Sequence, residues 1–193
     1  MTTERVEAFS DGVIAILITI MVLEFKVPAA ADLGALRPLL PVFLTYVLSF
    51  VVVGTYWNNH HHLLRAAEHV NGRVLWANLH LLFWLSLVPF VTGWMGENHF
   101  APVPTAVYGV VMLMCGVAYR ILVVSIVALG MNRALSAAIG SDFKGKISLV
   151  CYVAAIPLAF VNEWISDALY VGVILIWLIP DRRIERRVQD ERV

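Results

Sequence analysis

The sequence predicts an all-α membrane protein, and its composition is the first evidence for this fold class. Hydrophobic residues make up 60% of the 193-residue chain, charged residues make up 15%, and the mean hydropathy is +0.80. A chain this apolar is unlike a water-soluble domain and typical of a helical protein that crosses the bilayer several times. The apolar residues also fall in long runs separated by short polar breaks, as spanning helices require. The formal net charge of zero gives no reason to expect a nucleic-acid partner.

Six transmembrane helices are predicted from these runs and the breaks between them. They form a single domain over 1–193, because no internal repeat or linker divides the chain. The spans are expected at about 5–25, 36–64, 74–95, 106–130, 147–161 and 164–179.

Breaker residues mark the boundaries of the first three spans. The first span opens on the charged stretch RVEAFSD and closes before Pro28, and the second has Pro41 near its start. A polar turn over 65–73, which contains Asn71-Gly72, leads into the third span.

The second half of the chain follows the same pattern. A break rich in Gly, Asn and Pro over 96–104 precedes the fourth span, and a longer polar loop over 131–146 follows it. The fifth and sixth spans share a tight corner at Asn162-Glu163. The alternating charges of the tail, 181–193, fit a continuation of the sixth helix into the cytoplasm.

The distribution of positive charge predicts that both termini are cytoplasmic. With an even number of spans, one set of segments then collects most of the basic residues, as the positive-inside rule requires. The inner set holds five arginines of the tail and Arg5, Arg65, Arg73, Arg133, Lys144 and Lys146, whereas the outer loops hold Lys26 and Arg37. The outer face is left with an acidic excess, which raises the local cation concentration there.

One stripe of the first span lies on a single face of a helix. It carries Gly12, Ile16, Thr19, Ile20 and Leu23, at spacings of four, three, one and three. By itself this stripe is explained equally well by contact with lipid or with neighbouring helices.

Polar and ionisable residues gather where three of the predicted helices meet the inner boundary, a place where such groups are costly and often functional. The layer consists of Arg5, Ser10, Asp11, Trp57, His60, His61 and Asn78. Arg5 and Asp11 lie about 120° apart around their own helix, so each needs a partner on another helix or on another subunit.

Three interpretations of this layer remain open from the residues alone. It can be structural, with amides and charges satisfied between helices. It can titrate, as in a proton-coupled secondary transporter that uses His60 and His61. It can bind metal for catalysis, although membrane dimetal enzymes need several histidine boxes and this chain has one dense box.

The chain contains none of the common enzyme motifs. It lacks G-x-S-x-G, a phosphate-binding loop and H-E-x-x-H, and it also lacks a TVGYG-like filter. We therefore expect no enzyme activity, no cofactor and no metal ion.

The opening segment nevertheless resembles a known family. Arg5, then Phe9-Ser10-Asp11 and Gly12, followed by VIAILITIMVL, is similar to the R-x-x-x-F-S-D signature of the transmembrane protein 175 family. The residues at 56–61, Asn78 and the Pro89-Phe90 pair also resemble that family. The similarity is strong in the first half and rests on the pattern of spans in the second.

The resemblance implies a passive, potassium-permeable cation channel, which also admits other monovalent ions. Prokaryotic members of the family have six spans and assemble in the plasma membrane as homotetramers around a pore lined by the first helix. Carried over by register, the constriction falls on Ile16, Ile20 and Leu23, and Thr19 supplies a hydroxyl linked to potassium preference.

The polar layer has a supporting role by the same resemblance. A packing network holding the pore helix would contain Arg5, Asp11, Trp57 and a histidine of the second span, either His60 or His61. The alternative to the channel is the proton-coupled carrier.

Overall fold

The computed structural model describes residues 3–65, 67, 69–129 and 143–178, and its regular elements are all helical. This confirms the predicted all-helical class. The helices are α1 (Thr3–Ile20), α2 (Leu40–Arg65), α3 (Gly72–Ser86), α4 (Val88–Glu97), α5 (Pro102–Val127), α7 (Phe143–Leu158) and α8 (Glu163–Leu178), with 3₁₀ helices η1 (Met21–Glu24) and η2 (Leu33–Leu39). The predictions for 131–142 and for the tail, 181–193, lie outside the described residues.

Within the part of the chain that the structure describes, four helical stretches are long and apolar enough to cross a membrane. They are Thr3–Glu24, Leu33–Arg65, Gly72–Glu97 and Pro102–Val127. The fifth and sixth expected spans correspond to α7 and α8, each of 16 described residues. At about 1.5 Å per residue each is ~24 Å long, short of the ~30 Å hydrocarbon core. Six spans therefore stay a prediction.

The third expected span is divided into two helices. α3 ends at Ser86, and α4 begins at Val88. The cause is Pro89, which has no N–H to give to the carbonyl four residues earlier and whose ring clashes with that turn. The sequence predicts one continuous span over 74–95 because the hydropathy of this stretch is uninterrupted.

Short polar residues start two of the elements. Asp32 caps η2 by accepting the backbone N–H of Ala35 at 3.0 Å, and Asn71 caps α3 by accepting that of Val74 at 3.0 Å. Each satisfies a donor that the first turn of a helix leaves without a partner.

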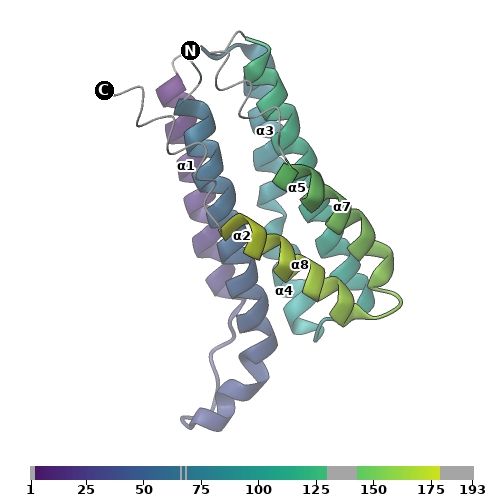
Figure 1. The fold of residues 1–193 in the computed structure, drawn as a ribbon. Helices are drawn as coiled ribbons and strands as arrows, with labels where there is room; N and C mark the ends of the chain where they lie inside the picture. The colour runs from purple at the N-terminus through teal and green to yellow at the C-terminus, as the bar shows by residue number, and fades with distance from the viewer. Residues whose placement is uncertain (1–2, 66, 68, 130–142, 179–193) are drawn as a thin grey trace.

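The helices form a bundle in which α1 lies to one side (Figure 1). α1 packs on α2 and α3, whereas α5 packs on α3, α4, α7 and α8. In Figure 1 the end of α2 lies beside the start of α1, and η2 extends past the opposite end of α1. The start of α1, the end of α2 and the start of α3 thus share one end of the bundle.

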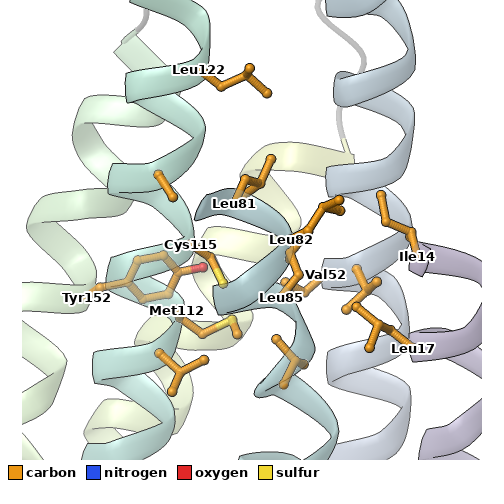
Figure 2. Packing of buried hydrophobic residues seen from close by; sticks show 14 of the residues in the cluster. Ile14, Leu17, Val52, Leu81, Leu82, Leu85, Met112, Cys115, Leu122 and Tyr152 are labelled. Carbon is orange, nitrogen blue, oxygen red and sulfur yellow. The ribbon is translucent and has the colours of Figure 1, made fainter. Parts of the chain in front are cut away.

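The core lies between these helices and is mostly apolar, although it includes buried polar side chains such as Ser10, His60 and Asn78. Leu81 and Leu85 of α3 and Met112 and Cys115 of α5 are fully buried, and Ile14 joins them from α1 (Figure 2). α1 is thereby anchored along one face, and its other face is left free of the bundle.

Candidate ion pathway and its polar support

The two faces of α1 differ sharply in their contacts. Its buried residues are Val6, Ser10, Ile14 and Leu17, at spacings of four, four and three, which form the face against α2 and α3. The opposite face carries Ile16 and Ile20 of the predicted constriction, and Leu23 follows them in η1. Ile16 is 62% exposed, Ile20 44% and Leu23 75%.

Gly12 and Thr19 lie on this exposed face too. The Thr19 hydroxyl donates to the backbone carbonyls of Ala15 and Ile16, each at 3.0 Å. Its only proton is therefore used within the helix. The lone pairs of its oxygen remain available to a cation.

A buried chain of hydrogen bonds ties α1 to α3 and α2. The amide nitrogen of Asn78 donates to Ser10 Oγ at 2.9 Å, and Ser10 Oγ donates to the Val6 carbonyl at 2.8 Å. The Asn78 amide oxygen lies 2.7 Å from His60 Nε2, which fixes the donor proton on that ring nitrogen. Ser10, His60 and Asn78, three members of the predicted polar layer, are thus brought into one contact chain.

Asp11 has a separate partner on α2. Trp57 Nε1 donates to Asp11 Oδ1 at 3.0 Å. Trp57 is 44% exposed, so this bond lies at the edge of the protomer and not in its core.

His61 contacts Glu7, one of the ionisable residues at the start of the first span but not a member of the predicted polar layer. Its Nδ1 lies 2.6 Å from Glu7 Oε1, and Arg65 Nε lies 3.7 Å from the same oxygen. The available signal was spacing: Glu7 and Asp11 are four residues apart, as are His61 and Arg65, so each pair lies on one helix face.

Arg5 takes no part in these contacts within the described protomer. Its side chain is exposed. It is not part of the three groups of contacts described above, which are Ser10–Asn78–His60, Asp11–Trp57 and Glu7–His61. A partner for Arg5 on a neighbouring subunit stays a prediction.

A cavity of about 150 Å³ lies away from this face. It opens between α2, α5, α7 and α8, and its lining includes Tyr56, Gly116, Leu149 and Val173. α1 contributes no residue to the lining. This cavity is therefore not part of a pathway along α1.

Comparison with known proteins gives the same family as the opening motif. Residues 5–89 match the model of the family described as endosomal/lysosomal potassium channel TMEM175. A protein named as a potassium channel from Chryseobacterium sp. (strain P1-3) is 53% identical over 191 residues, covering 98% of this chain and 100% of the relative. The proton channel TMEM175 of Bos taurus is 42% identical over 84 residues, which is 35% of this chain and 18% of that protein.

A solved structure matches the whole fold. It is the crystal structure of a lysosomal potassium-selective channel TMEM175 homolog from Chamaesiphon minutus, with a TM-score of 0.81 and 28% identity. The match covers 92% of this chain and 96% of that one. This chain belongs to the TMEM175 family of ion channels and is a multi-pass membrane protein, not an enzyme.

Proposed function

We propose that this protein is a potassium-permeable channel in which four copies of the chain surround a central pore lined by α1. Family membership supports the channel, and relatives over most of the chain are named as potassium channels. The observation that carries the pore assignment is the apolar surface formed by Ile16 and Ile20 of α1 and Leu23 of η1, which the protomer leaves uncovered. In a closed symmetric tetramer, the four copies of this surface would form a ring around the central axis.

The chemistry of the stripe suits a pore with an apolar constriction. Rings of Ile16, Ile20 and Leu23 would narrow the path and impose a barrier by excluding water. The Thr19 oxygen sits one turn from Ile16 and Leu23, where it would lower that barrier for a partly dehydrated cation. This arrangement passes potassium and, less well, other monovalent cations, down their gradient and without a cofactor.

The buried side of α1 supplies the support that such a pore needs. The Ser10–Asn78–His60 chain and the Asp11–Trp57 bond hold one end of α1 against α2 and α3. We assign Arg5 and His61 to the same supporting layer. The radius of the constriction then depends on how firmly α1 is held, because a small displacement of α1 moves the side chains that form the ring.

We place the protein in the plasma membrane of a prokaryote, with six spans and both termini cytoplasmic. The basic residues at the α1 start, the α2 end and the α3 start support this orientation. At the opposite end, Glu24, Asp32 and Glu97 give the outer mouth its acidic character.

The test is a current measurement on reconstituted protein. Reversal potentials under opposed potassium and sodium gradients should show potassium preference, and Ile16→Asn should raise conductance and reduce that preference. Ile121, an exposed isoleucine of α5, gives the matched control Ile121→Asn. Unchanged current in Ile16→Asn, or an equal change in both variants, would remove α1 from the pore.

The proton-coupled carrier is the remaining alternative, and the channel relatives do not favour it. A carrier would show saturable uptake coupled to a pH gradient, whereas a channel gives downhill flux that grows with driving force. A pH-sensitive dye inside the vesicles measures whether protons pass at all.

A further inference from the structure

The cavity between α2, α5, α7 and α8 has mainly apolar walls. Its volume is about 150 Å³, and Val52, Leu149, Val173 and Ile174 line it. An apolar cavity of about this size holds a group of roughly six carbon atoms, such as benzene, and stays free of water. In the hydrocarbon core of a membrane, the apolar groups present at high concentration are lipid acyl chains. The walls therefore suit a short stretch of acyl chain.

Most polar groups of the lining are already used within the protein. Thr55 Oγ1 donates to the Val51 carbonyl at 2.8 Å, and the side-chain amide nitrogen of Asn59 donates to the Thr55 carbonyl at 2.9 Å. Trp177 Nε1 donates to Ser148 Oγ at 2.9 Å. A water cluster needs several polar partners, and these bonds leave few of them. The cavity thus favours a hydrocarbon group over water.

The charged side chains of the lining have one sign. Arg120 of α5 and Lys146 of α7 contribute to it, and neither aspartate nor glutamate is among its described residues. Lys146 is exposed and lies in the first turn of α7, on the side that we place in the cytoplasm. Basic side chains at the inner membrane surface attract the headgroups of anionic lipids.

We propose that this cavity is a binding site for one anionic phospholipid of the inner leaflet. Part of an acyl chain occupies the space beside Val173 and Leu149, and the phosphate lies near Lys146 and Arg120. An anionic amphiphile is the one occupant that satisfies both the apolar walls and the positive charge. The lining comes from four helices, and α8 packs on α2, α5 and α7 (Figure 1). The lipid therefore binds the folded protein and should stabilise it.

The binding test is native mass spectrometry of the full-length protein, titrated with phosphatidylglycerol or with phosphatidylcholine of the same acyl chains. We expect one phosphatidylglycerol per chain, bound at least about fivefold more tightly than phosphatidylcholine, the factor that one basic residue near an anionic lipid supplies. Lys146→Gln should weaken phosphatidylglycerol binding about fivefold for the same reason. Lys144, on the same helix but outside the lining, gives the matched control Lys144→Gln, which should bind as wild type does.

A cavity-filling variant tests the acyl-chain part of the site without changing its charge. Val173 is buried and lines the cavity, so the ring in Val173→Phe should occupy the space of the chain. Phosphatidylglycerol binding should weaken at least about tenfold, because each methylene group kept out of the cavity weakens it about fourfold. Val171→Phe, at an exposed position of α8, should bind as wild type does. If Val173→Phe does not fold, Lys146→Gln carries the test, since Lys146 is exposed.

Fluorescence quenching locates the bound chain. Trp177 lines the cavity, whereas Trp164 of α8 is exposed and lies outside the lining. Phosphatidylglycerol brominated on an acyl chain should quench wild-type tryptophan fluorescence more than brominated phosphatidylcholine does. The excess should vanish in Trp177→Phe and persist in Trp164→Phe.

Three results would overturn the proposal. Equal affinity for the two lipids, or no binding of either, would exclude an anionic lipid site. Equal weakening in Lys144→Gln and Lys146→Gln would indicate general attraction to a basic surface. Wild-type affinity in Val173→Phe, or excess quenching that persists in Trp177→Phe, would place the lipid elsewhere. None of these measurements depends on ion conduction, so they are decided separately from the proposed channel.

Discussion

Asn78 on α3 donates a hydrogen bond to Ser10 on α1 across 2.9 Å, and both side chains are buried. The same amide meets His60 on α2 through its oxygen. One side chain thus connects the three helices whose ends form the polar layer. Loss of that amide leaves two buried polar groups without their partner.

Asn78→Ala should lower the free energy of unfolding by about 1 kcal/mol, the order found for interhelical hydrogen bonds in membranes and for unsatisfied buried groups. Thermal denaturation of the purified protein in detergent measures the change. Asn58 of α2 is exposed, so Asn58→Ala provides the control and should leave the melting temperature nearly unchanged. Similar shifts in both variants would contradict the role of the Asn78 contacts.

Gly12 offers a test of what covers the exposed face of α1. A Cβ at Gly12 meets nothing within 4 Å in the protomer, and the same holds for Gly172 of α8. Gly12→Leu should therefore keep the protomer folded but change conduction or assembly, because the added side chain enters the proposed pore. Gly172→Leu should behave as wild type in flux measurements and in size-exclusion chromatography. Normal flux in Gly12→Leu would indicate that this face touches lipid.

Thr19 should set part of the potassium preference. Thr19→Val keeps the shape and removes the oxygen, so the potassium-to-sodium permeability ratio should fall about fivefold, equivalent to about 1 kcal/mol. Thr19→Ser keeps the hydroxyl and should retain most of the potassium preference. Thr55 of α2 has the same back-bonded hydroxyl, to the Val51 carbonyl at 2.8 Å, and Thr55→Val should leave reversal potentials unaltered.

Gly96 permits the close approach of α4 to α2. A Cβ there would lie 2.5 Å from Thr45 Oγ1 and 2.8 Å from Val42 Cα, and the second of these is backbone that cannot move aside. Gly96→Ala should destabilise the protein by about 1–3 kcal/mol through overpacking. Gly54→Ala, at a position with open space, should be neutral or stabilising because alanine favours helix. A melting temperature that rises in Gly96→Ala would refute the close contact.

Asp11 is expected to matter for assembly. Asp11→Ala removes the acceptor of Trp57 and should reduce the fraction of tetramer in mild detergent, measured by light scattering during chromatography. Asp32 caps η2 away from this layer, so Asp32→Ala should leave the fraction unchanged. A stable tetramer with altered currents would place Asp11 in conduction and not in support.

The apolar composition and the long runs determined the all-helical membrane class, because lipid leaves a chain few other ways to satisfy its backbone. The opening motif identified the family, and its 3.6-residue period placed Ile16, Ile20 and Leu23 on one face before any contact was known. The break at Leu87 was missed because hydropathy does not respond to a missing N–H.

Only the tertiary structure decided which side chains meet. Sequence spacing relates residues on one helix, whereas Asn78 with Ser10, Trp57 with Asp11 and His61 with Glu7 are pairs between helices. Their contact depends on how α1 is rotated and packed against α2 and α3. That same rotation leaves the Ile16 face uncovered, since α1 can bury one face against this bundle and must offer the other to a partner or to lipid.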